Sequence, residues 1–208
     1  MLKADLLSEH FTRYKNCFQD KEAVPGHGNT EAGVLLIGEA PGKDEVRLSR
    51  PFAGKAGRYL DEFLCMIGIA REDIYITNTI KYRLSKTDSR TGRVSNRPAA
   101  RDEIVQNRPW LLKEIDILRP EYIVTLGNVP LKAVTGDNRT NIGTVHGKAA
   151  TLVIGECNYR LYALYHPASI IYNRSLRDTY INDIKGLRRL LSGDEPETSL
   201  IQTGFQPV

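Results

Sequence analysis

Cysteine is scarce in this chain, and its apolar runs are short. Three cysteines occur among 208 residues, and none is part of the CxxC spacing that marks metal sites. Their odd number and scattered positions argue against a disulfide framework. No apolar run approaches the roughly 20 residues that span a bilayer, and the first ten residues lack the apolar stretch of a secretory signal. We therefore expect a cytoplasmic protein with reduced cysteines and no membrane partner.

Two further signatures are missing or weak. The glycines form neither GxGxxG nor a GKS/GKT phosphate loop, so a dinucleotide or nucleoside triphosphate site lacks its fingerprint. The net charge is only +4, which permits but does not require a polyanionic partner. Residues 81–101 concentrate seven lysines and arginines against one acidic residue, Asp88. This segment is either a solvated loop or a surface that contacts phosphate.

Short apolar segments alternate with amphipathic ones along the chain. The predicted strands cover residues 34–37, 74–77, 122–126, 151–154 and 160–165, and the predicted helices cover 1–14, 54–68, 99–118, 128–134 and 175–191. The run VLLI at 34–37 is continuously apolar, as in a parallel strand buried on both faces. We expect one α/β domain over residues 1–191, with helices on both faces of a mostly parallel sheet, followed by a flexible tail over 192–208.

Three loops follow the carboxyl ends of predicted strands, which is where ligands bind in open α/β sheets. The first loop opens at Glu39, the second at Asn78 and the third at His166. Glu45 follows shortly after Glu39, so one loop can bring two carboxylates to a single site. Each residue also has an ordinary alternative, as a solvated carboxylate, a turn cap or a structural histidine.

The residue types in these loops suit a flat, hydrogen-bonding ligand. Phe52 can offer its ring to a planar partner, although most aromatic residues simply fill cores. The amide of Asn78 both donates and accepts, as the Watson–Crick edge of a base requires. Pro167 fixes the chain after His166, and Ser169 can cap a turn or contact phosphate. The combination predicts a pocket for a planar ring.

Five motifs, in this order, resemble the uracil-DNA glycosylase superfamily and most closely its family 4. They are GEAPG at 38–42, RPFAGKAG at 50–57, YITN at 75–78, LGN at 126–128 and HPAS at 166–169. The resemblance spans residues 26–191. It implies a three-layer α/β/α sandwich around a short, mostly parallel sheet. It also implies hydrolysis, without a cofactor, of the N-glycosidic bond between uracil and deoxyribose in DNA.

The resemblance further implies a role for each motif residue. Phe52 would stack on the flipped base, Asn78 would read its amide edge, and His166 would hydrogen-bond the carbonyl that gains negative charge as uracil leaves. Glu39 would position water or stabilise the sugar cation, with Glu45 assisting.

The other expected site residues border the base or the DNA. They are Gly38 and Ala40 beside the uracil, and Pro167, Ser169, Arg83 and Arg174 along the DNA. Ala40 stands where some sister families carry a catalytic Asp or Asn, so catalysis would depend on Glu39.

One family feature is missing from the sequence. Family 4 proteins typically bind a four-iron four-sulfur cluster through two cysteines near the amino terminus, one after YITN and one in the following helix. Tyr82 and Asn107 stand at the last two positions, and only Cys17 offers a match near the amino terminus. We expect no cluster, no other metal and no cofactor.

Three functions remain open on the sequence. The favoured one is a monomeric uracil-DNA glycosylase of base excision repair, acting on single- or double-stranded DNA that contains uracil or another deaminated base. The second is a catalytically weak DNA- or RNA-binding protein that keeps the fold. The third is a nucleotide-binding enzyme of the doubly wound type, which the missing phosphate loop disfavours.

Overall fold

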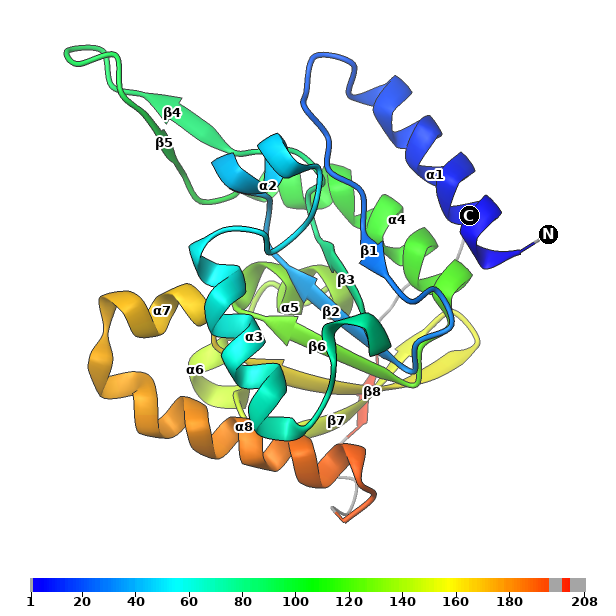
Figure 1. The fold of residues 1–208 in the computed structure, drawn as a ribbon. Helices are drawn as coiled ribbons and strands as arrows, with labels where there is room; N and C mark the ends of the chain where they lie inside the picture. Colours follow the sequence, from blue (N-terminus) through cyan, green and yellow to red (C-terminus); the bar gives the residue numbers. More distant parts are fainter. Residues whose placement is uncertain (1, 195–199, 203–208) are drawn as a thin grey trace.

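The computed structural model describes residues 2–194 and 200–202 (Figure 1). Within these residues, a seven-stranded sheet has the order β1-β3-β2-β6-β8-β7-β9, and a separate hairpin pairs β4 with β5. The strands are β1 (His27–Gly28), β2 (Val34–Gly38), β3 (Tyr75–Asn78), β4 (Ser85–Thr87), β5 (Val94–Asn96), β6 (Tyr122–Leu126), β7 (Ala149–Ile154), β8 (Cys157–Leu164) and β9 (Leu200–Gln202).

Helices fill the connections between these strands. They are α1 (Lys3–Cys17), α2 (Lys43–Leu48), α3 (Lys55–Ile67), α4 (Arg101–Leu118), α5 (Asn128–Thr135), α6 (Ile142–Val145), α7 (Pro167–Tyr172) and α8 (Arg177–Leu191), with 3-10 turns η1 (Arg71–Asp73) and η2 (Arg174–Leu176). In the described part of the chain, no helix combines the length and apolar character that a membrane crossing needs.

The four central strands, β3, β2, β6 and β8, run parallel. β2 is buried on both faces: Leu35 and Ile37 pack on the side of α1, α4 and α5, while Leu36 packs on the side of α3 and α8. Burying each such side chain contributes roughly 1.5–3 kcal/mol. The helices therefore form layers on both faces of the sheet (Figure 1), which confirms the expected three-layer α/β/α sandwich.

The long helix α4 shows how the sequence sets these elements. Its first turn is capped by Glu103, whose carboxylate accepts a hydrogen bond from the Ala100 N–H at 2.8 Å. It ends at Arg119, which adopts a left-handed conformation directly before Pro120, a residue that cannot continue the helix. The predicted helix over 99–118 is thus confirmed to within two residues.

Two segments differ from the sequence-based expectation. Residues 85–96 contain the β4–β5 hairpin, which projects from the body of the molecule rather than forming an irregular loop (Figure 1). In the carboxy-terminal tail, Leu200–Gln202 forms β9 and pairs in parallel with β7, where a flexible tail was expected. Residues 195–199 and 203–208 lie outside the described residues. The boundary between the domain and the tail remains a prediction there.

Candidate active site

The expected site residues converge because the parallel strands end at one edge of the sheet. β2 ends at Gly38 and β3 at Asn78, and the backbone continues to pair beyond both ends. The Thr79 N–H donates to the Gly38 carbonyl at 2.8 Å, and the Ile80 N–H donates to the Glu39 carbonyl at 3.0 Å. β3 and β6 flank β2 on opposite sides, so this edge is a topological switch point, the usual place for a ligand.

Gly38 lets an amide and an aromatic ring meet at the end of β2. A Cβ atom at this position would lie 2.4 Å from Asn78 Oδ1 and 2.7 Å from the ring of Phe52, closer than real contacts allow. Asn78 is 4% exposed and Phe52 is 5% exposed. Two of the predicted base-binding residues, Asn78 and Phe52, therefore lie directly against a third, Gly38.

Phe52 is held in a strained backbone conformation, with a φ of +52°. Such a conformation costs a non-glycine residue on the order of 1–3 kcal/mol, and it is typical of functional sites. The Arg71 guanidinium, placed by η1, donates to the carbonyl oxygens of Pro51 and Phe52, both at 2.8 Å, and pairs with Asp61 at 2.7 Å. A Cβ at Gly57 would lie 1.8 Å from the Phe52 carbonyl oxygen, so only glycine fits there.

Glu45 joins the two loops on either side of α2. Its Oε2 accepts a hydrogen bond from the Gly42 N–H and its Oε1 from the Gly54 N–H, both at 3.1 Å. These contacts tie the GEAPG turn to the PFAG turn and occupy both carboxylate oxygens. The geometry thus gives Glu45 a loop-holding role, and its expected assistance in catalysis remains a prediction.

Glu39 is a half-buried carboxylate at the rim of the site. Burial raises its pKa above the usual value for glutamate, and a hydrogen bond from the Ala99 N–H to Oε1 at 2.9 Å opposes that shift. Among the described residues, no donor reaches Oε2. One oxygen is therefore left to orient water or to face a developing positive charge.

His166 is fixed as a neutral hydrogen-bond donor. Its Nδ1 accepts from the Ala168 N–H at 3.1 Å, which assigns the proton of the neutral ring to Nε2. Burial lowers the pKa of His166 to about 4, so the ring stays uncharged near neutral pH. The imidazole stacks on Phe52, with 5.9 Å between ring centroids and 27° between planes. Gly127, with a φ of +93°, faces the His166 Cβ.

These features agree with what a comparison with known proteins finds. Residues 25–185 match the Uracil DNA glycosylase superfamily. The chain belongs to this superfamily. The resemblance to it that the motifs carry is confirmed.

Curated type-4 uracil-DNA glycosylases from archaea are similar over most of the chain. The one from Archaeoglobus fulgidus is 34% identical over 176 residues, covering 83% of this chain and 84% of that protein. The one from Sulfurisphaera tokodaii is 36% identical over 172 residues, covering 81% and 74%. The one from Saccharolobus solfataricus is 33% identical over 196 residues, covering 90% and 86%.

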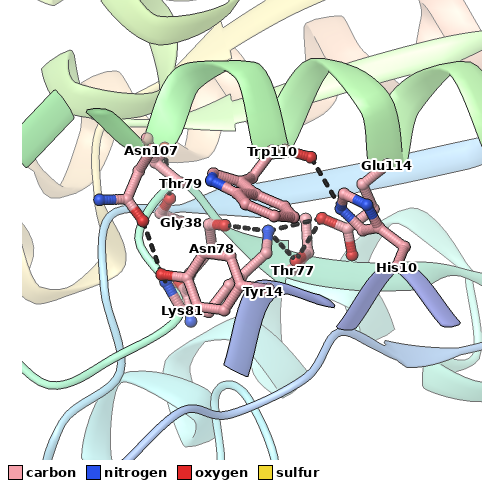
Figure 2. A network of polar contacts seen from close by, with 10 residues as sticks. All are labelled: His10, Tyr14, Gly38, Thr77, Asn78, Thr79, Lys81, Asn107, Trp110 and Glu114. Carbon is pink, nitrogen blue, oxygen red and sulfur yellow. Dashed lines mark hydrogen bonds and ion pairs between the residues drawn. The ribbon is translucent and has the colours of Figure 1, made fainter. Parts of the chain in front are cut away.

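The iron–sulfur cluster expected of uracil-DNA glycosylase family 4 does not fit the residues of this chain. Tyr82 and Asn107, at two of the ligand positions, are buried and joined to Tyr14: Tyr14 donates to Asn107 Oδ1 at 2.6 Å, and Asn107 Nδ2 donates to the Tyr82 hydroxyl at 3.4 Å. Figure 2 shows the Tyr14–Asn107 contact. Such clusters need thiolates, and Cys17 is exposed at the end of α1. In residues 2–194 and 200–202, no group of His, Cys, Asp or Glu could hold a metal.

The expected DNA-binding residues lie on two flanks of the site. Pro167 and Ser169 are in α7, where the Ser169 N–H donates to the His166 carbonyl at 2.8 Å, and Arg174 is exposed in η2 just beyond. Arg83 lies at the base of the hairpin, with its Nε donating to Asn96 Oδ1 at 2.9 Å. In Figure 1, α7 and the hairpin lie on the side toward which the arrowheads of β2 and β6 point. Their DNA contacts remain predictions.

Two residues change the sequence interpretation of this region. Lys81, counted with the basic segment, is buried and paired with Glu114, so it cannot contact phosphate. Ala40 packs against a small aromatic cluster around Tyr14 and Tyr82. No motif pointed to Arg71, which lies 19 residues from Phe52 and supports it only through tertiary contacts.

Proposed function

We propose that this chain is a uracil-DNA glycosylase, which adds water across the N-glycosidic bond and releases uracil from DNA as a free base. The observation that carries the proposal is that two groups with complementary chemistry border the Gly38–Asn78–Phe52 cluster: Glu39, with one carboxylate oxygen unused, and His166, a neutral hydrogen-bond donor. The curated names of the relatives support it. Hydrolysis breaks the C1′–N1 bond, and a water oxygen forms the new bond to C1′.

His166 acts on the departing base. As the bond to the sugar breaks, negative charge builds on a carbonyl oxygen of uracil. The Nε2–H of a neutral imidazole stabilises that charge by a hydrogen bond. Because the pKa of His166 is lowered to about 4, the ring donates this bond as a neutral imidazole and not as an imidazolium. Such a donor typically contributes about 10²–10³-fold in rate.

Glu39 acts on the sugar side of the same bond. The deoxyribose becomes oxocarbenium-like in the transition state, and a carboxylate stabilises that cation and orients the attacking water. The free Oε2 suits this role. Burial leaves the Glu39 carboxylate less strongly solvated than a surface glutamate, which raises its pKa and strengthens its electrostatic effect on a nearby positive charge.

Base selection falls to Asn78 and Phe52. A base in duplex DNA must be extruded at a cost of a few kcal/mol, least when it is mispaired, so uracil opposite guanine is a favourable target. The Phe52 ring then offers an apolar face, and the Asn78 amide reads the hydrogen-bonding edge. Ser169, Arg83 and Arg174 supply sequence-independent contacts to the DNA backbone.

An oligonucleotide assay tests the proposal. A labelled duplex with a single uracil is incubated with the protein, treated with alkali and resolved by size, with thymine at the same position as the control. The uracil strand should be cut at that position in a U:G, U:A or single-stranded substrate. Salt-sensitive binding without cutting of any of these would contradict the proposal and favour a DNA-binding protein that keeps the fold. Hypoxanthine and xanthine substrates define the base range.

We also propose that the protein is monomeric and cytoplasmic. The scattered cysteines support a reducing compartment. Light scattering of the purified chain at micromolar concentration tests the monomeric state.

A further inference from the structure

Directly behind Asn78 lies a buried lysine that the proposed chemistry does not use. The ammonium of Lys81 donates to the main-chain carbonyl oxygen of Asn78 at 2.5 Å, to Thr77 Oγ1 at 2.9 Å and to Glu114 Oε2 at 2.5 Å. Lys81 and Glu114 are each 3% exposed. Figure 2 shows the three contacts converging on the lysine nitrogen, between the end of β3 and helix α4.

These contacts satisfy the lysine completely. An ammonium has three N–H donors, and each has one acceptor here. Thr77 Oγ1 also donates to Glu114 Oε2 at 3.0 Å, so the carboxylate oxygen that pairs with the lysine is held in turn. A buried ion pair is weak evidence for stability, because its desolvation offsets much of the attraction. The geometry of the Lys81–Glu114 pair is therefore better explained by the backbone that it orients, at the carbonyl of Asn78.

The main chain of Lys81 is fixed as firmly as its side chain. Its N–H donates to the Tyr14 hydroxyl at 3.0 Å, and its carbonyl oxygen accepts from the Val24 N–H at 2.6 Å. Tyr14 donates in turn to Asn107 on α4. Lys81 is therefore held by contacts to α1, to the segment before β1 and to α4. Through its ammonium it in turn holds one atom of the site, the carbonyl oxygen of Asn78.

We propose that Lys81, held by Glu114, is a positioning residue that sets the orientation of Asn78 toward the base. The inference rests on the proposed function. Asn78 reads the base through an amide whose direction depends on its backbone, and a displacement of about 1 Å at a reacting centre costs on the order of 10²-fold in rate. The three donors of the Lys81 ammonium are all taken by protein acceptors, so we expect Lys81 to act on the base through Asn78.

The test uses variants that remove the lysine without leaving a buried charge. Lys81→Met alone would leave Glu114 buried and unpaired, which is strongly destabilising. The double variant Lys81→Met/Glu114→Gln removes both charges and keeps an amide where the carboxylate was. A second pair, Lys81→Met/Glu114→Met, replaces the site by apolar side chains, and thermal unfolding shows which pair folds.

A matched control is available at Lys3. It also joins a backbone carbonyl and a carboxylate, Leu118 O at 2.8 Å and Glu31 Oε2 at 3.0 Å, but it lies at the start of α1 rather than behind the site. Lys3→Met therefore tests the loss of the same kinds of contact without any effect on Asn78.

Single-turnover excision of uracil from a U:G duplex is the readout. The folded double variant should excise about 10–100-fold more slowly, while its affinity for the duplex stays that of the wild type, because only the geometry of the bound base is disturbed. Lys3→Met should excise at the wild-type rate. In an Asn78→Ala background, the double variant should add no further loss, because the residue through which Lys81 acts is already truncated.

Two results would overturn the inference: a wild-type rate in the folded double variant, or a full, independent loss on top of Asn78→Ala. Either one leaves the proposed function intact, because the wild-type protein still excises uracil. Failure of the wild type to cut any uracil substrate would instead refute the proposed function, and the positioning role with it.

Discussion

The rim of the site and the polar network behind it use similar side chains in opposite ways. At the rim, Glu39 has one unused oxygen and a raised pKa, Phe52 is strained, and His166 is desolvated. Behind Asn78, all three N–H donors of the Lys81 ammonium have acceptors, and Glu114 Oε2 accepts from both Lys81 and Thr77, at 2.5–3.0 Å. The groups to which we assign chemistry are thus strained, desolvated or incompletely paired, whereas the lysine to which we assign a positioning role has every donor paired.

The largest expected effect is at Glu39. Glu39→Gln keeps the shape and the Ala99 contact but removes the negative charge that faces the sugar cation, so single-turnover excision should fall by about 10²–10⁴-fold. Thermal unfolding should change little, because within the described residues the Glu39 side chain makes one hydrogen bond, from the Ala99 N–H. A Glu39→Gln protein with the wild-type rate would refute the role assigned to this residue.

His166→Ala should cause the second-largest loss of excision rate. Loss of the donor to the departing base should lower the single-turnover rate by about 10²–10³-fold, with duplex affinity much less changed. His27→Ala is the control, since His27 is an exposed histidine on β1, at the edge of the sheet. Equal rates in the two variants would show that His166 contributes no more than a surface histidine.

Arg71→Ala should give an intermediate effect. It removes both hydrogen bonds to the Pro51 and Phe52 carbonyls, so the strained Phe52 should relax and excision should fall by about tenfold, together with a lower melting temperature. Arg119→Ala, at an exposed arginine paired with Asp116, is the matched control for loss of a guanidinium. Unchanged excision by Arg71→Ala would mean that Phe52 keeps its position without this support.

The pH dependence separates the two rim groups. Above pH about 4 His166 is neutral, so loss of excision on the acid side should follow protonation of Glu39, at a pH above the usual range for glutamate. For stability the two groups act in opposite directions. The folded pKa of His166 is below its unfolded value, so its contribution is complete near pH 7 and is lost as the pH falls from about 6.5 towards 4. The folded pKa of Glu39 is above its unfolded value, so its contribution is present at acid pH and is lost as the pH rises through the folded pKa. Rate and unfolding profiles from pH 4 to 8 check both. An acid limb unchanged by Glu39→Gln would contradict the assignment.

The smallest expected effect is on the hairpin. Arg93→Ala should leave excision at low salt nearly unchanged and reduce the dependence of log affinity on log salt by about 1, if the side chain contacts a phosphate. Fluorescence anisotropy of a labelled duplex between low and physiological salt measures this slope. A slope equal to that of the wild type would place the hairpin outside the DNA interface.

The positions of the site residues at the strand ends could be predicted from the sequence, whereas the buried residues behind them could not. Strand ends could be located because continuous apolar runs such as 34–37 stop at glycine or asparagine, and the rule for parallel sheets then brings Glu39, Asn78 and His166 together. The sequence places Lys81 in a basic segment that is either a solvated loop or a phosphate-contacting surface, and its burial could not be predicted because its partner Glu114 lies 33 residues away on another element. The β4–β5 hairpin was missed because its strands are polar and short, without the alternation that marks a half-buried strand.

The same substitution, glutamate to glutamine, at one rim residue and at one residue behind Asn78 tests most directly whether the two regions have different roles. Excision rate and melting temperature are measured side by side for Glu39→Gln and Glu114→Gln. Glu39→Gln should lose most of its rate and keep its melting temperature. Glu114→Gln, which leaves the Lys81 ammonium buried without a counter-charge, should lose melting temperature and a smaller share of its rate. The reverse pattern, with Glu114→Gln inactive but stable and Glu39→Gln active, would contradict the assignment of chemistry to Glu39 and of a supporting role to Glu114.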